Sequence, residues 1–352
     1  MQDALTIGEV AEKLGVSTET LRRWDKMGKF PSQRNPINNY RYYSVEQVEK
    51  LVREMFPEYG LTTLFASAMR PWLETEWGKL YESDAVEFLR SVESDSVDLV
   101  FADPPYNIKK AEWDTFQSQK EYVEWSLGWI REAHRILRPT GSLYICGFSE
   151  ILADLKWGAS PLFKGCKWLV WYYRNKANLG KDWGRSHESI LHFRKGRDFK
   201  FNMDSVRIPY NAHTLKYPSH PQAESSQYGN GKKHVWTPHP NGAKPKDVLE
   251  IPTLSNHSWE RQDHPTQKPV ALLRKCIEAS TDPGDLVVDP FGGSGTTFAV
   301  AEALGRRWTG CELSGEYCDL IMHRLSDRPH ILRIASGSDD EVAAYRRERL
   351  RG

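Results

Sequence analysis

The sequence has few cysteines and no long apolar run. Its 352 residues include 5 cysteines, scattered and without a Cys-x-x-Cys pair, which argues against both a disulfide framework and a structural zinc site. No stretch of about 18 apolar residues and no signal-peptide pattern is present, so we expect a cytoplasmic protein without a membrane span. Excess charge is also absent, with 48 basic and 47 acidic residues. Any nucleic-acid surface must therefore be local.

What the chain does contain is enough apolar sequence for a complete core, at 39% hydrophobic and 12% aromatic residues. From Lys79 onward, short apolar runs alternate with amphipathic segments, which predicts an α/β fold with a doubly wound, mostly parallel sheet. The expected strands are 79–84, 97–102, 142–147, 167–173, 189–193, 286–289 and 307–312. The expected helices include 85–91, 121–137 and 270–279, with further helices after residues 297 and 314.

An Asp-Pro-Pro-Tyr tetrapeptide follows the strand expected at 97–102. In an open α/β sheet, ligands bind at the carboxyl ends of strands. The Asp103 carboxylate and the Pro104 carbonyl, which no regular ladder uses, can accept hydrogen bonds from one NH2 group. Tyr106 can stack on a flat ring, so the set suits an exocyclic amine on a nucleobase. A Pro-Pro turn with Asp103 and Tyr106 in structural roles is the alternative, and the tetrapeptide alone does not decide between them.

A second motif lies where a glycine-rich turn, Asp289 to Thr297, joins a strand to a helix. Its glycines let a ligand approach the backbone at the helix N-terminus. About 20 residues later a further strand ends at Glu312, whose carboxylate can accept from two ribose hydroxyls. Both the G-x-G-x-x-G spacing of dinucleotide sites and the Gly-Lys-Ser/Thr of a P-loop are absent. An adenosyl ligand without phosphates fits better, which points to S-adenosylmethionine.

Residues 4–56 form a separate predicted module with two short helices around Gly15-Val16 and a third helix after Ser44. Through matching runs at 7–11, 14–17, 20–24, 28–31 and 41–44, it resembles the winged helix-turn-helix of the mercury-resistance-regulator and excisionase group. The resemblance implies DNA contacts from Arg22, Arg23 and Lys26 on the second helix and from Arg41 on the wing. A small helical cap with solvated charges is the alternative.

Between the two chemical motifs, residues 194–260 interrupt the strand–helix alternation with Pro, His, Asn and Ser. Residues 167–250 carry 15 Lys or Arg against 7 Asp or Glu, although the whole chain is nearly neutral. Irregular, basic sequence with interleaved aromatic residues suits a DNA-backbone surface. A solvated insertion is the alternative, but loops this long in compact domains are usually functional.

The order of these parts resembles the β group of amino DNA methyltransferases. In that group the Asp-Pro-Pro-Tyr motif comes first, followed by a target-recognition region and then the cofactor loop; here His264–Pro269 lies just before that loop. The resemblance covers roughly residues 79–328. Methyltransferases of RNA or of protein glutamine that carry a related tetrapeptide place the cofactor loop first. The resemblance therefore implies a Rossmann-like S-adenosylmethionine-dependent methyltransferase fold with permuted motifs.

The resemblance also implies a role for each matching residue. Asp103 and the Pro104 carbonyl accept hydrogen bonds from the target amine, with Pro105 completing the motif, and Tyr106 stacks on a base flipped out of the duplex. The implied cofactor residues are Asp289, Phe291, Gly293, Ser294, Gly295 and Thr296, with Glu312 on the ribose, Asp84 near the adenine, and His264, Thr266 and Lys268 over the methionine end. Asp84 and the 264–268 stretch could equally be a cap and a turn. His187-Glu188 either belongs to the core or borders the base pocket.

We therefore expect a site-specific adenine-N6 DNA methyltransferase that acts on double-stranded DNA. Cytosine-N4 methylation is the closest alternative; Asp103 favours adenine because the cytosine relatives more often have serine there. A DNA-binding regulator that only senses the cofactor is a third hypothesis, against which the intact motifs argue. Candidate partners are a cognate restriction endonuclease and a second copy of the chain. The expected domains are the winged helix-turn-helix at 1–56, a linker at 57–78, the catalytic domain at 79–330 with the target-recognition region at about 194–260, and a charged tail at 331–352.

Overall fold

In a computed structural model the chain divides into two compact units, one mainly from Met1–Arg70 and the other mainly from Pro71–Phe88 and Asp95–Gly352. The structure describes residues 4–14, 16–34, 40–55, 69–106, 116–174, 181, 183–218, 220–222 and 234–336. Each unit has a hydrophobic core of its own. Within these described ranges, no helix is both long and apolar enough to cross a bilayer.

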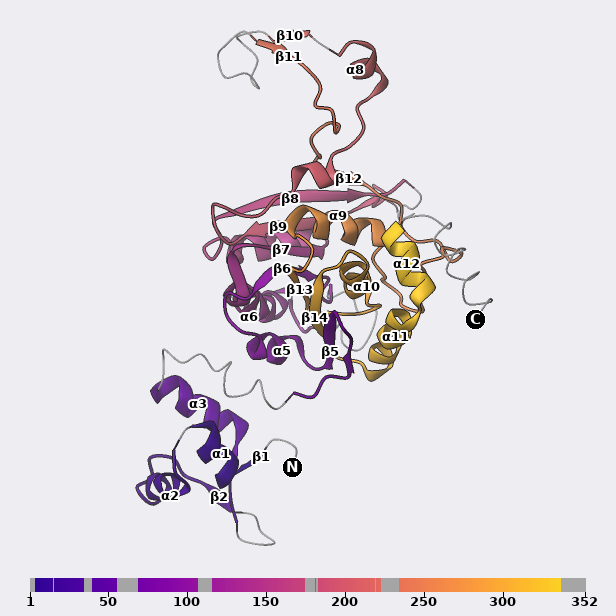
Figure 1. The fold of residues 1–352 in the computed structure, drawn as a ribbon. Coiled ribbons are helices and arrows are strands. Elements are labelled where there is room, and N and C mark those ends of the chain that lie inside the picture. Colours follow the sequence, from indigo (N-terminus) through magenta and orange to yellow (C-terminus); the bar gives the residue numbers. More distant parts are fainter. Residues whose placement is uncertain are drawn as a thin grey trace, which may run out of the picture. The chain divides into compact units, whose positions relative to one another are not determined.

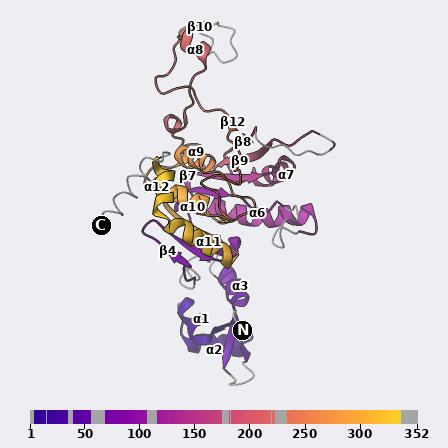
Figure 2. The ribbon, with the colours of Figure 1, turned by 90° about the vertical axis from the view of Figure 1, so that its right-hand side faces the viewer.

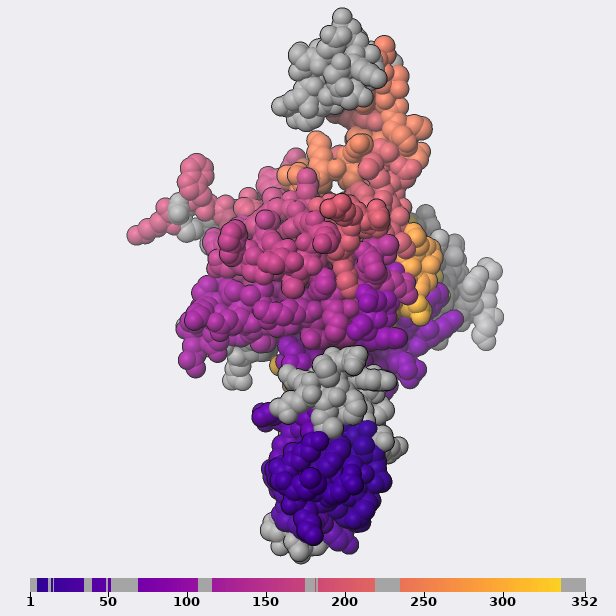
Figure 3. Space-filling view, turned by 90° about the vertical axis from the view of Figure 1, so that its left-hand side faces the viewer, coloured from indigo at the N-terminus to yellow at the C-terminus, as the bar shows by residue number. Residues whose placement is uncertain are grey.

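The N-terminal unit, indigo in Figure 3, packs short helices against an antiparallel sheet of order β1-β3-β2. Its elements are β1 (Ala4–Thr6), α1 (Ile7–Lys13), α2 (Thr18–Lys26), β2 (Gln33–Arg34), β3 (Arg41–Ser44) and α3 (Val45–Met55). The Ser17 hydroxyl caps α2 by accepting from the Thr20 amide at 3.1 Å. Ser44 and Gln47 cap α3 reciprocally, because each side chain accepts from the backbone amide of the other. The three predicted helices are confirmed.

The second unit contains a nine-stranded sheet of order β12-β8-β9-β7-β6-β13-β14-β5-β4 (Figure 1). Its strands are β4 (Leu73–Glu74), β5 (Gly78–Glu82), β6 (Val97–Ala102), β7 (Leu137–Gly147), β8 (Gly165–Tyr172), β9 (His187–Arg194), β12 (Val248–Glu250), β13 (Leu286–Asp289) and β14 (Arg307–Glu312). The central strands β7, β6, β13, β14 and β5 pair in parallel. β9 runs antiparallel to both of its neighbours, and β4 forms a hairpin edge with β5. The predicted doubly wound, mostly parallel sheet is confirmed.

Helices cover both faces of this sheet, with α6 and α7 on one face and α9 to α12 on the other (Figure 2). The helices are α5 (Ala85–Ser91), α6 (Gln119–Ile136), α7 (Ser149–Ala159), α9 (Val270–Ser280), α10 (Thr296–Ala303), α11 (Gly315–Ser326) and α12 (Arg328–Ser336). Strand β6 is buried along its whole length, as expected for a central parallel strand. The buried Asp98 carboxylate joins two distant segments by accepting from Arg138 at 2.8 Å and from the Leu286 amide at 3.0 Å.

The structure differs from the predicted boundaries in several places. β4 belongs to the sheet, so the catalytic unit begins inside the predicted linker, 57–78. α12 runs past the predicted end at 330, because Ile331 and Ile334 are buried in the core although the surrounding sequence is charged. β7 begins before the expected Ser142.

Part of the predicted target-recognition region, 194–260, belongs to the main sheet. Its β12 pairs in parallel with β8 and so forms one edge of the main sheet. Before β12 come a 3₁₀ turn (Met203–Val206), α8 (Ala212–Lys216) and the hairpin of β10 (His220–Gln222) with β11 (His234–Trp236). An isolated antiparallel β-bridge between Ile208 and Ala243 joins the two ends of the segment that contains α8, β10 and β11. The rings of Tyr210 and Trp236 pack edge to face, with their centroids 5.9 Å apart.

Candidate active site

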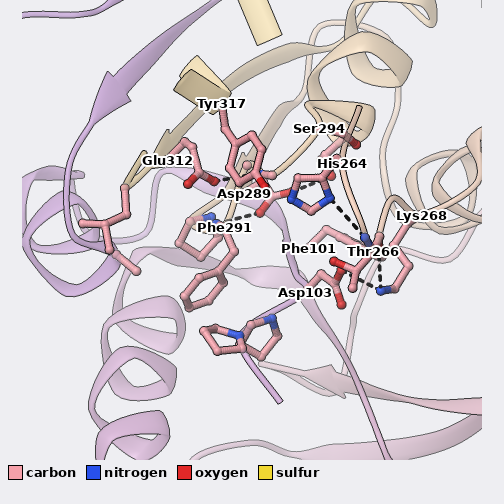
Figure 4. A pocket seen from close by; sticks show the side chains of 18 of the residues that line it. Phe101, Asp103, His264, Thr266, Lys268, Asp289, Phe291, Ser294, Glu312 and Tyr317 are labelled. Atoms are coloured by element: carbon pink, nitrogen blue, oxygen red, sulfur yellow. Dashed lines mark hydrogen bonds and ion pairs between the residues drawn. The ribbon is translucent and has the colours of Figure 1, made fainter. Parts of the chain in front are cut away.

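Three neighbouring parallel strands end in acidic residues or lead directly into them. Asp103 follows β6, Asp289 ends β13 and Glu312 ends β14. Because these strands are adjacent and parallel, the three carboxyl groups lie along the same edge of the sheet. A cavity of about 280 Å³ opens there and is lined by all three residues. Figure 4 shows Asp103 with Lys268 at one side of this cavity and Glu312 with Tyr317 at the other.

The Asp103 carboxylate is held through both of its oxygens. Lys268 donates to Oδ2 at 2.6 Å, and the Tyr106 hydroxyl donates to Oδ1 at 2.7 Å. The Tyr106 hydroxyl also lies 3.2 Å from the Glu188 carboxylate, and its ring packs edge to face on Phe148. Burial, reinforced by the two nearby carboxylates, raises the pKa of Tyr106 well above its usual range, so its hydroxyl stays protonated and donates.

The prolines of the tetrapeptide fix the backbone after β6. Pro104 and Pro105 both line the cavity. The Pro105 carbonyl accepts from the Tyr122 hydroxyl on α6 at 2.6 Å, which ties the tetrapeptide to that helix. The tetrapeptide is thus part of a cavity wall and not only a turn.

Lys268 lies on the Asp103 side of the cavity, and its side chain is only 7% exposed. Its ammonium also lies 3.6 Å from Glu188 and 3.5 Å from the Thr266 carbonyl. Burial by itself lowers the pKa of Lys268, but the Asp103 and Glu188 carboxylates outweigh it and raise the pKa above the ordinary value. Lys268 is therefore a buried cation shared by two carboxylates.

The glycine-rich turn holds Asp289 under the cavity. Its carboxylate accepts from the Phe291 amide at 2.9 Å and from the Thr297 hydroxyl at 2.5 Å. Burial raises the pKa of Asp289 to about 8, against the opposing effect of these donors. Phe291 projects from the turn into the cavity and is packed edge to face by Trp129.

Two glycines of this turn have left-handed backbone conformations, with φ of 52° at Gly293 and 71° at Gly295. Such angles favour glycine. A Cβ atom at Gly295 would also lie 2.9 Å from Ile321. The Gly293 amide donates to Glu312 at 2.7 Å, and the Ser314 amide donates to the other Glu312 oxygen at 3.0 Å. The carboxylate keeps lone pairs for further donors.

His264 lies between the glycine turn and α11. Its ring packs against Tyr317 with centroids 4.6 Å apart, and it lies 3.3 Å from where a Cβ of Gly293 would be. Burial lowers the pKa of His264 to about 4, so the ring is neutral at physiological pH. Its Nδ1 accepts from the Thr266 amide at 3.4 Å, which makes the 264–266 stretch a turn at the cavity wall.

The remaining predicted cofactor residues have structural partners as well as cavity positions. Asp84 caps α5 by accepting from the Val86 amide at 2.8 Å, yet it lines the cavity. Ser294 and Thr296 line the cavity too, and the buried Arg324 donates to the Ser294 carbonyl and the Thr296 hydroxyl, each at 2.9 Å.

The cavity has a lining with the chemistry that an adenosyl group requires. It combines aromatic rings with a carboxylate, Glu312, that faces the glycine turn. Its volume of about 280 Å³ is close to the lower end of ordinary ligand pockets. Among the described residues, no cluster of His, Cys, Asp or Glu is arranged to hold a metal ion.

The predicted DNA-contacting residues belong to the other unit and are described there by themselves. Arg22, Arg23 and Lys26 are exposed on α2. Arg41 instead donates to the Asp25 carboxylate at 2.7 Å, with its side chain 27% exposed. Arg22 also donates to the exposed Glu19 carboxylate at 3.1 Å, so the structure pairs two of the four basic side chains with acids.

Two residues of this site have no definite assignment from the sequence. The sequence leaves Glu188 open between the core and the base pocket, and the structure puts it beside Tyr106 and Lys268. Tyr317 belongs to no sequence motif, although it lies in the first turn of the helix that follows Glu312. Its place after a strand-ending acid is a signal that could have identified it.

Two family models match the two parts of this chain. The DNA methylase family model for N6 and N4 enzymes matches residues 97–323, and the model of MerR family regulatory proteins matches residues 6–43. The chain is 35% identical to the type II methyltransferase M1.MboII of Moraxella bovis, over 69% of this chain and 94% of that protein. It is 34% identical to the DNA adenine methyltransferase YhdJ of Escherichia coli, over 71% of this chain and 83% of that protein.

A solved structure shares the fold. The PvuII DNA methyltransferase, described as cytosine-N4-specific, superposes with a TM-score of 0.57 at 22% identity, over 77% of this chain and 97% of that one. This similarity supports the permuted methyltransferase fold predicted from the motif order. The chain therefore belongs to the N6/N4 family of DNA methylases, enzymes that transfer a methyl group from S-adenosylmethionine to DNA.

Proposed function

We propose that this chain methylates the exocyclic N6 amine of adenine at a specific site in duplex DNA. The observation that carries the proposal is the position of Asp103: its carboxylate follows β6 and lies in the same cavity as the glycine turn after β13. An amine bound to Asp103 would therefore lie beside a cofactor in that turn. The similarity to a protein named DNA adenine methyltransferase supports adenine over cytosine, as does aspartate at position 103.

The proposed chemistry depends on positioning. An aromatic amine is a poor nucleophile because its lone pair is delocalised into the ring. Asp103 and the Pro104 carbonyl accept hydrogen bonds from its two N–H groups and favour a tetrahedral nitrogen with a localised lone pair. The ring of Tyr106 stacks on the base, which has left the duplex because the amine is unreachable in the stack. Orientation and fixed electrostatics supply most of the rate enhancement.

The cofactor positions follow from the same cavity. Glu312 accepts from the ribose hydroxyls, Phe291 and the 293–296 turn contact the adenosyl group, and Asp84 lies toward the adenine. Asp289 holds the turn through the Phe291 amide. His264 and Thr266 cover the methionine end. S-adenosylmethionine, when bound, would supply the methyl group: its S–CH3 bond would break as the N–CH3 bond forms, S-adenosylhomocysteine would leave, and the methylated amine would release one proton to solvent.

The surrounding parts bind the substrate DNA. Arg22, Arg23 and Lys26 on α2 contact phosphates or base edges, Arg41 supports the wing, and residues 194–260 select the target sequence. Relatives named type II methyltransferases support a cognate restriction endonuclease as a partner. A homodimer is a further candidate assembly, and the enzyme works in the cytoplasm, on prokaryotic or phage DNA.

Mass analysis of nucleosides tests the proposal directly. Unmethylated DNA of mixed sequence is incubated with the protein and S-adenosylmethionine and then digested to nucleosides. N6-methyladenine is the expected product. N4-methylcytosine as the product would show that the target is the cytosine N4 amine instead. If neither methylated nucleoside forms, the result would favour a regulator that only senses the cofactor.

A further inference from the structure

The Asp103 side of the cavity contains a second carboxylate, Glu188, which comes from the antiparallel strand β9. Lys268 lies between the two acids, 2.6 Å from Asp103 and 3.6 Å from Glu188. All three side chains are shielded from solvent, with exposed fractions of 7% for Lys268, 18% for Asp103 and 17% for Glu188. Shielding two acids and a base from water has a large desolvation cost unless the charges are well paired.

We propose that Lys268 and Glu188 are positioning residues for Asp103. Lys268 holds the Asp103 carboxylate in a fixed orientation before the base arrives, and Glu188 is the second acceptor to which Lys268 and Tyr106 turn when the target amine takes its place on Asp103. The inference rests on the proposed function, because it assigns these side chains to the amine side of the reaction.

The need for a second acceptor follows from the bonds to Asp103. One of its oxygens receives the Lys268 ammonium and the other receives the Tyr106 hydroxyl. A carboxylate has further lone pairs, but an incoming amine must reach them past two donors that already crowd the group. Relief of this crowding requires that at least one donor finds another partner.

Glu188 is close enough to be that partner without any backbone movement. Its Oε2 atom lies 3.2 Å from the Tyr106 hydroxyl, compared with 2.7 Å for Asp103. Lys268 would have to move about 1 Å to exchange one carboxylate for the other, since its two distances are 2.6 and 3.6 Å. Neither donor is left unpaired in a buried site during the exchange, which avoids the cost of a missing hydrogen bond.

Lys268 is the cation that the two acids share. The ionisable groups that face Lys268 are Asp103, Tyr106, Glu188, Cys146, Tyr173 and His264. Lys268 is the cation among these groups, because His264 is neutral at physiological pH. Without its ammonium, Asp103 and Glu188 would lie shielded from solvent with no cation between them, and such an unpaired arrangement is costly. The target amine needs an acceptor on Asp103, and the shared cation keeps that acceptor in place.

The assignment differs from a cofactor role for Lys268. The sequence resemblance puts the 264–268 stretch over the methionine end, and His264 and Thr266 are consistent with that position. Lys268, however, directs its ammonium to Asp103 and to the Thr266 carbonyl. The two roles predict different effects of removing the ammonium. A cofactor role predicts a loss of cofactor affinity, whereas a positioning role predicts a change in the pH dependence of turnover.

The first experiment uses full-length Lys268→Met, which removes the charge and keeps the length. Calorimetry should give an S-adenosylmethionine affinity within about twofold of wild type, while turnover on mixed-sequence DNA at neutral pH falls roughly 100-fold. The pH dependence of turnover should differ from that of wild type, because the variant lacks the cation that lies between two shielded acids. Lys268→Arg should restore most of the wild-type rate and its pH profile.

Lys200→Met is the matched control. Lys200 also bridges two acids, Asp282 and Asp285, but none of these three residues lines the cavity. It should leave the pH profile of turnover unchanged. A second variant, Glu188→Gln, keeps an acceptor but removes its charge and should lower turnover several-fold, whereas Glu188→Ala should lower it further. Thermal melts of all variants separate these effects from loss of folding.

Each result decides between the hypotheses. Parallel loss of cofactor affinity and turnover in Lys268→Met would assign Lys268 to the cofactor. An unchanged pH profile in Lys268→Met, or full activity in Glu188→Ala, would overturn the positioning role while the wild-type activity still supports the proposed function. A wild-type protein that methylates no DNA would contradict the proposed function itself.

Discussion

The Gly293 amide donates to the Glu312 carboxylate at 2.7 Å, although the two residues are 19 positions apart and lie on different strand-to-helix turns. This bond joins the turn after β13 to the end of β14 and fixes one side of the cavity. Two predicted cofactor residues thus position each other. Substitution of either should therefore affect cofactor binding more than folding.

Gly293→Val tests this relationship. Valine is poorly tolerated at φ of 52°, and its side chain would press on His264, which lies 3.3 Å from the position of the first added carbon. We expect the affinity for S-adenosylmethionine to fall by at least about tenfold, measured by calorimetry. Gly284→Val is a matched control, because Gly284 also has a positive φ, 86°, but has no neighbouring atom within 4 Å. Equal affinities for the Gly293 variant and wild type would refute a cofactor role of the turn.

Asp103→Ala should separate binding from chemistry. The substitution removes the acceptor of the target amine, so product formation should fall by roughly 100-fold or more. Cofactor affinity should change little, because the bonds of Asp103 go to Lys268 and Tyr106. Calorimetry and a nucleoside assay on one preparation provide both measurements. Joint loss of both properties would assign Asp103 to the cofactor or to stability.

The stability of the protein should depend on pH through Asp289. Burial raises its pKa from the unfolded value of 3.8 to about 8, so the folded state holds a proton that the unfolded state releases. The contribution is therefore fully present below about pH 4 and is lost as the pH rises toward 8. Asp289→Asn should flatten this part of the curve of unfolding free energy against pH. Asp198→Asn, at an exposed position, should leave the slope unchanged, and an unaltered slope in Asp289→Asn would show that Asp289 is ionised in the folded protein.

The exposed basic side chains of α2 should govern the salt dependence of DNA binding. Combined replacement of Arg22, Arg23 and Lys26 by alanine should weaken binding and reduce the slope of log K against log salt by roughly 0.9 for each phosphate that the variant no longer neutralises. Arg41→Ala should act differently, because Arg41 is paired with Asp25 and its removal also loosens the unit. Deletion of residues 1–56 should leave the methylated base unchanged. A slope identical to that of wild type in the triple variant would leave the unit as a structural or protein-docking domain.

Much of this site could be predicted because its residues follow strands. The carboxyl ends of parallel strands meet at one edge, so a strand before Asp103 and another before Asp289 suffice to bring the two motifs together. The Lys268–Asp103 pair could not be predicted in this way, since it spans 165 residues and depends on the path of a turn. The helix α7 was not predicted either, because Phe148 occupies its N-cap position and provides no side-chain cap.

The pairing of β6 with β13, reinforced by the bond of Asp98 to Leu286 across 188 residues, has a consequence for synthesis on the ribosome. β6 is among the first strands of its unit to emerge, but one of its two partners, β13, is synthesised much later, since the Asp98–Leu286 bond spans 188 residues. Until then a fully buried central strand has an unpaired edge, the kind of edge that recruits strands from other chains. Chaperone capture and aggregation of truncated chains should therefore change at lengths just beyond residue 289, where β13 becomes available to close the sheet.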